Sequence, residues 1–154
     1  MARTLRIIGI TDSTMADGPG LRNTIWAAGC AHHCKGCHNP QTWDFKAGYE
    51  IDIEQLAEEA GGEPFIDVTF SGGDPVYQAE GFAELARLLK QKGKNIWLYT
   101  GFLLEDIYKQ PGGKELLQWV DVVVDGPYIQ DLKETQQAFR GSTNQRFLYR
   151  GVDF

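Results

Sequence analysis

Residues 65–75 read FIDVTFSGGDP, a run of strand-forming residues that stops at two glycines. Apolar residues at helical spacing follow over residues 78–91 and predict an amphipathic helix. The same order then recurs, because residues 95–100 (NIWLYT) and 120–124 (VDVVV) predict two further strands that are apolar on both faces. Strands that alternate with helices favour a parallel sheet with right-handed crossovers.

The residues upstream extend this α/β pattern. Residues 5–10 and 24–28 predict strands, and residues 52–60 predict a helix with Asp52 as its N-cap. About five or six strands are too few for a closed eight-stranded barrel. We therefore expect an α/β fold in which a mostly parallel, curved sheet forms a partial, open β/α barrel.

The length of the chain indicates one domain. A chain of 154 residues can bury a single sizeable core, so we expect residues 1–154 to form one domain. The sequence after Gly126 is polar and only weakly periodic. Residues 127–154 are therefore expected to form a C-terminal tail that packs on this domain or on a partner.

Charge and hydropathy exclude several kinds of partner. The formal net charge is −6, and the basic residues form no stripe that could follow a phosphate backbone, so we expect no nucleic-acid partner. No run approaches the roughly 18–20 apolar residues of a membrane span, and the N-terminus lacks the pattern of a signal peptide. We therefore expect a cytoplasmic protein with no membrane partner.

The turns that follow the predicted strands collect the unusual residues. They are GCAHHCKGCHN at 29–39, SGGDP at 71–75, TGF at 100–102 and DGPY at 125–128. In parallel α/β folds, ligands bind at the carboxyl ends of the strands. We therefore expect one site to use all four turns.

The first of these turns holds every cysteine of the chain, Cys30, Cys34 and Cys37. Three thiols within eight positions make no disulfide framework and instead favour metal binding in a reducing compartment. A four-iron cluster held by three thiolates keeps one iron open for a substrate. The alternative is a closed zinc site that a nearby histidine completes. The candidate histidines are His32, His33 and His38.

These motifs carry a resemblance to a known superfamily. The C-x3-C-x2-C loop resembles the signature of the radical S-adenosylmethionine enzymes, and SGGDP resembles their GGEP motif with Asp74 in place of the usual Glu. DGPGLR at 17–22 and CHNPQTWD at 37–44 are similar to the activating enzymes of glycyl radical enzymes. The segments SGGDPVYQ, IWLYTGF, VDVVVDGPYIQDLK and RGSTNQR resemble the anaerobic ribonucleoside-triphosphate reductase activating proteins.

The resemblance implies a cofactor and a reaction. Cys30, Cys34 and Cys37 would bind a [4Fe-4S] cluster, whose open iron would take the amino and carboxylate groups of S-adenosylmethionine. One-electron reduction would cleave this ligand to methionine and a 5'-deoxyadenosyl radical, so the protein would be a radical SAM oxidoreductase with no catalytic side chain beyond its cofactors. The radical would take hydrogen from a glycine in the catalytic subunit of the reductase. A flavodoxin-like protein is the expected electron donor.

The resemblance also suggests which residues contact S-adenosylmethionine. Gly72 and Gly73 would let the backbone approach the methionine moiety, because a Cβ atom would block the approach. Asp74 has two open roles, either an acceptor for the substrate ammonium or a cap for the helix that follows. DGPGLR, residues 17–22, is the candidate element for positioning the partner's glycine.

The adenine side of the site is predicted from residues 36–38. Many members of the superfamily carry an aromatic residue just before the last cysteine, whereas this chain has Gly36. His38 could supply a ring from the other side, with the backbone of Gly36 and Cys37 completing the contact. His38 could instead be a metal ligand or an ordinary surface residue.

Two other functions remain open at the level of sequence. One is activation of a different glycyl radical enzyme such as pyruvate formate-lyase, whose activating enzymes share the DGPG loop and CHN but are considerably longer. The other is a zinc-stabilised α/β module that binds a partner. The colour of the purified protein would separate these classes. A glycyl radical activating enzyme would be brown and oxygen-sensitive, whereas a zinc-stabilised module would be colourless.

Overall fold

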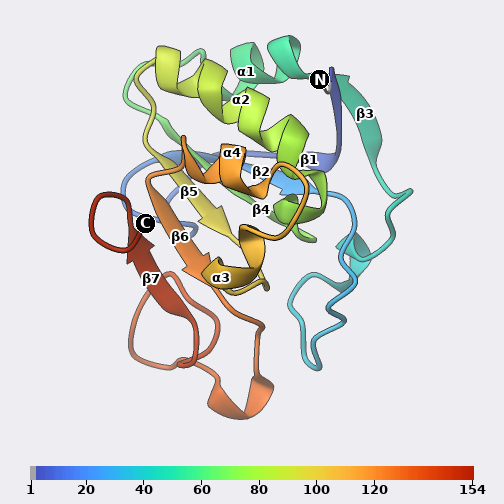
Figure 1. The fold of residues 1–154 in the computed structure, drawn as a ribbon, viewed down its shortest axis with the longest axis vertical. Helices are drawn as coiled ribbons and strands as arrows, with labels where there is room; N and C mark the ends of the chain where they lie inside the picture. The colour runs from blue at the N-terminus through green and yellow to red at the C-terminus, as the bar shows by residue number, and fades with distance from the viewer. Residues whose placement is uncertain (1–2) are drawn as a thin grey trace.

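The computed structural model describes residues 3–154 and places seven strands in one sheet, in the order β3-β1-β2-β4-β5-β6-β7 (Figure 1). The strands are β1 (Thr4–Thr14), β2 (Arg22–Ala27), β3 (Tyr49–Asp52), β4 (Asp67–Gly72), β5 (Ile96–Tyr99), β6 (Val122–Asp125) and β7 (Arg146–Tyr149). The α-helices are α1 (Ile53–Gly61), α2 (Ala79–Gln91), α3 (Leu104–Ile107) and α4 (Gly113–Leu117). Three short 3-10 turns are η1 (Pro40–Thr42), η2 (Pro75–Gln78) and η3 (Gln130–Leu132).

The sheet is mixed, with a parallel centre. Strands β2, β4, β5 and β6 pair in parallel, whereas β1 and β7 run antiparallel to their central neighbours. Strand β3 pairs antiparallel with β1 and therefore points the same way as the centre. The predicted α/β class with a mostly parallel sheet is confirmed, and the sheet does not close on itself, because β3 and β7 are its two edges.

Helices α1 and α2 form where the sequence pattern places them. Asp52 precedes α1 and accepts a hydrogen bond from the Gln55 backbone N–H at 3.1 Å, so the predicted N-cap is confirmed. Helix α2 buries Phe82, Leu85 and Leu89 completely against the sheet. Within the described residues, no helix is both long and apolar enough to cross a membrane.

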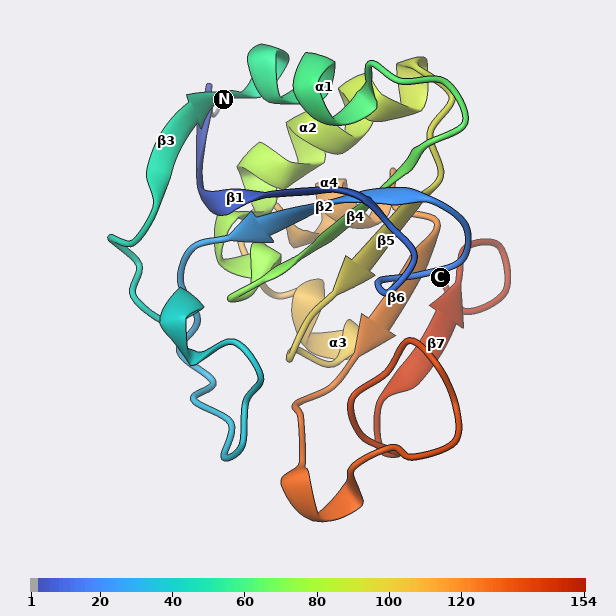
Figure 2. The same cartoon turned by 180° about the vertical axis from the view of Figure 1, so that it is seen from behind.

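The two faces of the sheet are covered differently. Val68 and Phe70 of β4 point into a large apolar cluster with residues of α1, α2 and α4, and these helices lie on one face (Figures 1 and 2). We call this side the helix face. The alternate residues point the other way, where Trp97 packs with Phe139 and Phe147 from the C-terminal segment. We call this second side the loop face, because chain segments without helices cover it.

Two strands have no counterpart in the predicted elements. Strand β3 is four residues long and pairs only with β1 at the sheet edge. Strand β7 lies within residues 127–154 and pairs with β6, with Leu148 opposite Val123. Both are short edge strands whose pairing partner lies far away in sequence, so no local pattern indicates them.

Strand β1 is also longer than predicted and ends at Thr14. Register shifts between Ile7 and Gly9 and between Thr11 and Thr14 mark irregular pairing with β2. The loop that joins β1 to β2 is therefore residues 15–21, shorter than the polar stretch of the sequence indicates.

Candidate functional site

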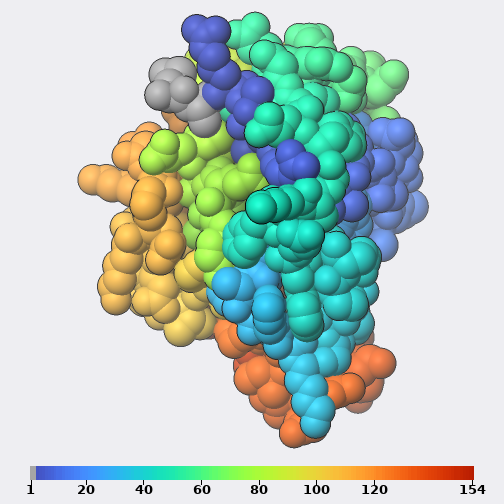
Figure 3. Space-filling model, turned by 90° about the vertical axis from the view of Figure 1, so that its right-hand side faces the viewer, coloured from blue at the N-terminus to red at the C-terminus, as the bar shows by residue number. Residues whose placement is uncertain are grey.

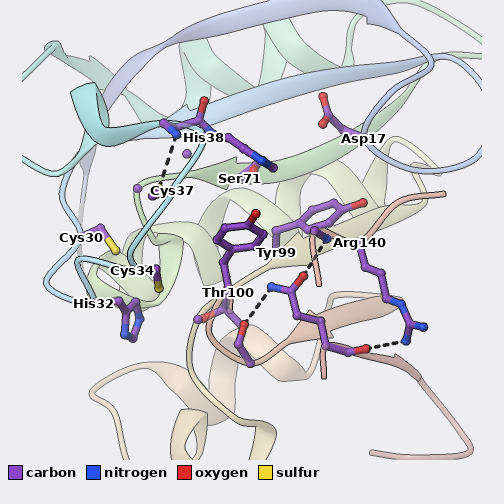
Figure 4. Close-up of a pocket in the computed structure, with 18 of the residues that line it drawn as sticks. Asp17, Cys30, His32, Cys34, Cys37, His38, Ser71, Tyr99, Thr100 and Arg140 are labelled. Atoms are coloured by element: carbon purple, nitrogen blue, oxygen red, sulfur yellow. Dashed lines mark hydrogen bonds between the residues drawn. The ribbon is translucent and has the colours of Figure 1, made fainter. Parts of the chain in front are cut away.

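A cavity of about 340 Å³ opens on the loop face, at the carboxyl ends of the central strands (Figure 4). Its volume lies near the lower end of the roughly 300–1,000 Å³ typical of ligand pockets. All four turns that were predicted to share a site line it, through residues of 30–39, 71–73, 100–101 and 126–128. The prediction of one common site is therefore confirmed as geometry.

The three cysteines all line this cavity as free thiols. Figure 4 shows Cys30 and Cys34 together at one end of it. Burial raises the pKa of the Cys30 thiol to about 11 and also raises the pKa of Cys34. A thiolate in this loop therefore needs a compensating positive charge, which a bound metal centre supplies.

Backbone hydrogen bonds define the base of the cysteine loop. Gly29 N–H donates to Thr42 O at 2.7 Å and Cys30 N–H donates to Trp43 O at 3.1 Å. These bonds tie the start of the loop to η1 and the residue after it. Further along, Cys37 N–H donates to Cys34 O at 3.1 Å and closes a tight turn. The loop thus holds its three thiols in a fixed backbone.

Each histidine of the loop contacts another side chain. The ring of His33 stacks on Trp43 with centroids 4.4 Å apart, and His38 lies 5.0 Å from the ring of Tyr128. His32 Nε2 lies 2.7 Å from Asp74 Oδ2. Between residues 3 and 154, no three side chains of the His, Cys, Asp or Glu type lie close enough together to hold one metal ion.

Three of the side chains that line the cavity are thiols, which are the usual ligands of iron–sulfur clusters. A four-iron cluster binds each thiolate through a separate iron, whereas a single zinc ion needs every ligand atom about 2.0–2.3 Å from one point. His32 and His38 line the same cavity. The thiols therefore suit an iron–sulfur cluster in their chemistry.

The predicted glycines of the β4 turn lie beside the cysteine loop. Gly72 and Gly73 both line the cavity. Gly72 has a φ of +121°, and a Cβ atom there would collide with the backbone of Ala27. A Cβ atom on Gly73 would lie 2.5 Å from Gly29 O. The fold itself therefore requires glycine at both positions, because this turn packs directly on the base of the loop.

Two predicted site residues lie outside the cavity lining. Gly36 has a φ of +76° and faces the side chain of Gln130, at the place where the cysteine loop meets the C-terminal segment (Figure 3). Asp74 is completely buried and caps η2 by accepting a hydrogen bond from Val76 N–H at 3.0 Å. Asp74 thus acts as a cap, but of this short turn rather than of α2, whose N-cap position is Gln78. Cys37 and His38 do line the cavity.

The end of the cavity away from the cysteines is polar and charged. Figure 4 shows Asp17 and Arg140 toward this end. Thr24 Oγ1 donates to Asp17 Oδ2 at 3.0 Å. Arg140 is held by Glu134 at 2.7 Å and by Gln145 O at 2.9 Å. One carboxylate and one guanidinium thus reach the lining from opposite ends of the chain.

Residues after Gly126 supply one wall of the cavity. Phe139, Arg140, Gly141 and Gln145 line it beside Tyr128, which belongs to the predicted DGPY turn. Tyr99 donates from its hydroxyl to Phe139 O at 2.6 Å, and burial raises the pKa of this phenol, with Asp17 adding to the rise. Arg140, Gly141 and Gln145 belong to the RGSTNQR motif, but nothing in that motif indicated that it lines the cavity.

Comparison with protein families identifies the class first. The family model described as a 4Fe-4S single cluster domain matches residues 16–148. This range contains every residue that lines the cavity. The match supports an iron–sulfur cluster and defines the class as a single-cluster iron–sulfur protein.

Individual relatives then narrow the class. The anaerobic ribonucleoside-triphosphate reductase-activating protein of Enterobacteria phage T4 is 36% identical, and the alignment covers 89% of this chain and 88% of that protein. The proteins of the same name from Haemophilus influenzae and Escherichia coli K12 are 35% and 30% identical, over 84% and 85% of this chain and 88% and 90% of their own lengths. The chain belongs to the family of anaerobic ribonucleoside-triphosphate reductase-activating proteins, as its motifs indicated.

Proposed function

We propose that this chain activates an anaerobic ribonucleoside-triphosphate reductase by radical S-adenosylmethionine chemistry, as a radical SAM oxidoreductase. The observation that carries the proposal is the cavity itself. Three free thiols of one loop lie at one end of a space whose remaining walls come from the ends of parallel strands. The printed names of the relatives supply the target, the anaerobic reductase.

In this proposal Cys30, Cys34 and Cys37 bind a [4Fe-4S] cluster. The loop supplies three thiolates, so one iron is left for the amino and carboxylate groups of S-adenosylmethionine. When bound, the cluster would supply the one-electron chemistry for cleavage of S-adenosylmethionine, and a glycine of the partner would be the hydrogen donor. The protein contributes position and shelter rather than an acid or a base.

The chain's own residues then divide the cavity. The backbone of Gly72 and Gly73 borders the methionine side, next to the cysteine loop. The backbone of Cys37 and the ring of His38 border the adenine side, and Gly36 shapes this turn from outside the lining. The nearby ring of Tyr128, 5.0 Å from His38, makes that side aromatic.

In this proposal the C-terminal segment helps to exclude water from the cavity. Tyr99 holds Phe139 by a 2.6 Å hydrogen bond, and Arg140 is fixed by two further hydrogen bonds. These contacts keep the C-terminal segment in place across from the cysteines. We propose that residues 1–154 act as one radical SAM domain with a partial β/α barrel, and that residues 127–154 complete its site.

The partners follow from the same chemistry. The catalytic subunit of the reductase is the protein substrate, and a flavodoxin-like protein is the proposed electron donor. Clustered thiol ligands require a reducing compartment, so we propose a cytoplasmic location. Activation of another glycyl radical enzyme, such as pyruvate formate-lyase, is the alternative, and the names shared by the relatives favour the reductase.

The test begins with anaerobic purification, iron and zinc analysis, and reconstitution with iron and sulfide. We expect roughly four irons per chain, as one four-iron cluster requires, and formation of 5'-deoxyadenosine with dithionite and S-adenosylmethionine. Cys34→Ala should abolish cleavage, whereas Lys35→Ala, an exposed neighbour in the same loop, should keep it. Stoichiometric zinc with no deoxyadenosine would overturn the proposal in favour of a zinc-stabilised binding module.

A second step tests the partner. The reduced, reconstituted protein is mixed with the catalytic subunit of an anaerobic ribonucleoside-triphosphate reductase or with pyruvate formate-lyase, and the glycyl radical is recorded by electron paramagnetic resonance. We expect the radical signal in the reductase. A signal only in the lyase would reassign the target while leaving the chemistry intact.

A further inference from the structure

Asp74 occupies the place in SGGDP where the resemblance predicts a contact with the substrate ammonium, but its oxygens already have partners. Oδ1 accepts from Val76 N–H at 3.0 Å and from the Thr100 hydroxyl at 2.9 Å. Oδ2 accepts from Gly101 N–H at 2.9 Å and lies 2.7 Å from His32 Nε2. A carboxylate offers about four lone-pair positions. Four donors of the chain itself therefore use the capacity of this carboxylate.

The burial of Asp74 agrees with this count. Its side chain is 0% exposed, and the residue does not line the cavity. Its partners His32, Thr100 and Gly101 do line the cavity and stand between the carboxylate and the open space. A ligand in the cavity therefore meets the partners of Asp74 before it meets Asp74.

His32 connects this buried carboxylate to the cysteine loop. The residue lies between Cys30 and Cys34 in sequence, and its ring is 19% exposed. With Asp74 as a carboxylate, which only accepts, His32 donates this hydrogen bond through Nε2. The centroid of the His32 ring lies 4.7 Å from that of Phe102. The ring also packs against Gly101, where an added Cβ atom would lie 2.7 Å from the His32 Cδ2 atom.

The same residue lies between two cysteines of the loop. His32 is two residues after Cys30 and two residues before Cys34. The groups that hold metal ligands in position are one of the factors that tune a metal centre. Fixing the His32 side chain therefore fixes the stretch of loop that carries two candidate ligand sulfurs.

We propose that Asp74 and His32 form a positioning pair that locks the cysteine loop onto the carboxyl end of β5 and thereby sets the potential of the cluster. Only the effect of this pair on the cluster depends on the proposed function; the contact itself does not. Asp74 acts through His32 and makes no contact with S-adenosylmethionine. Thr100 and Gly101 complete the lock from the β5 side.

The first experiment uses metal-free protein and a double-mutant cycle. The variants are Asp74→Asn, His32→Ala and the double variant, each measured by thermal unfolding. We expect the double variant to lower Tm by less than the sum of the two single variants, because both changes break the Asp74–His32 contact while each also removes contacts of its own. His33→Ala is the matched control, since this neighbouring histidine stacks on Trp43, and its effect should add to that of Asp74→Asn.

The second experiment uses reconstituted protein. Without S-adenosylmethionine, His32→Ala and Asp74→Asn should both shift the midpoint potential of the cluster, whereas His33→Ala should leave it unchanged. His32→Gln retains a side-chain N–H and should restore the potential partly toward that of the wild type. These readouts do not depend on cleavage of S-adenosylmethionine.

Three outcomes would overturn the positioning pair. The first is additive losses in the thermal cycle. The second is a large loss of S-adenosylmethionine binding in Asp74→Asn with none in His32→Ala, which would make Asp74 a direct ligand contact. The third applies if Asp74→Asn fails to fold, and it is a cluster midpoint potential that is unchanged in His32→Ala. Since the thermal cycle needs no cluster, it decides the pairing even if the proposed function fails.

Discussion

The two faces of the central sheet are built from alternate residues of the same strands, yet they bury different chemistry. On the helix face, Val68 and Phe70 are completely buried among aliphatic and aromatic side chains. On the loop face, the intervening Thr69 is equally buried but hydrogen-bonded to Arg22 and to the backbone of Asp17. Neighbouring residues of one strand thus face an apolar core on one side of the sheet and a polar layer on the other.

The covers of the two faces differ in the same way. Helices α1, α2 and α4 seal the helix face by apolar contact. Residues 15–21 and the C-terminal segment cover the loop face, and hydrogen bonds from Arg22 and Tyr99 hold them. Because hydrogen bonds are directional, this second cover fixes where its residues stand. The helix face thus supplies most of the apolar core, whereas the loop face positions the residues of the site.

The largest expected effect tests the helix face. Phe82 of α2 is completely buried, and its ring lies 4.9 Å from that of Phe70. Phe82→Ala should lower the free energy of unfolding by about 3–5 kcal/mol, because it removes a large side chain from a packed core. Urea unfolding would measure this loss. A loss below about 1 kcal/mol would mean that this face does not carry the stability we assign to it.

The next effect tests the cover of the loop face. Arg22 is buried, and it donates to Thr69, Pro19 O, Val68 O and Asn95. Arg22→Met should lower the free energy of unfolding by about 2–3 kcal/mol, since several buried carbonyls lose their donor. Protease cleavage within residues 15–21 should also become faster.

The matched control for this change is Arg87→Met on α2. Arg87 is 39% exposed and pairs with Glu84 on the same helix. An exposed pair of this kind contributes little to stability, so this variant should unfold at nearly the same urea concentration as the wild type. Equal losses in the two arginine variants would contradict the role assigned to Arg22.

A smaller effect comes from exchanging the chemistry of adjacent residues in β4. Thr69→Val removes a hydroxyl that accepts from Arg22 at 2.8 Å and donates to Asp17 O at 2.7 Å. Val68→Thr places a hydroxyl in the apolar cluster. Each should cost about 1–2 kcal/mol in urea unfolding, the first by losing hydrogen bonds and the second by burying a hydroxyl without one. If either change were neutral, the two faces would not differ as described.

The smallest effect concerns acid. Arg140 donates to Glu134 at 2.7 Å in the C-terminal segment and lowers the pKa of that carboxyl below its ordinary value of 4.5. The folded state therefore favours the carboxylate, so the stability from this pair is complete above pH 4.5 and is lost as the pH falls through the lowered pKa. Nuclear magnetic resonance titration should show the low pKa in the wild type and its return toward 4.5 in Arg140→Gln.

The helix face supplies a reference for this titration. Arg87 lowers the pKa of Glu84 through the same kind of contact. This value should stay low in Arg140→Gln, because the two pairs lie on different faces. A change in both glutamates would indicate a general loss of structure rather than a local release of the C-terminal segment.

The helix face could be predicted from the sequence almost completely. Apolar spacing over residues 78–91 marks α2, and Asp52 marks the start of α1, because both signals are local. The edge strands β3 and β7 could not be predicted, since each depends on a strand that lies elsewhere in the chain. Short strands carry too few residues for their own pattern to show.

The candidate site was predictable only in part. The spacing of the cysteines indicated a metal site, and the position of the four turns after strands indicated that they share it. The partners of Asp74 come from residues as distant as His32 and Thr100, and Phe139 reaches the cavity from the C-terminal segment. Such contacts depend on how the sheet is ordered, which the local sequence does not contain.

The wall formed by the C-terminal segment has a consequence for the newly made protein. Roughly 90 residues separate Cys37 from Tyr128, and at about 5–20 residues per second a ribosome needs about 5–20 seconds to make them. During this interval the thiols have been translated but the opposite wall has not. The cysteine loop is therefore open on the nascent chain, and the chamber is complete only after the C-terminal residues have left the ribosome and packed across from it.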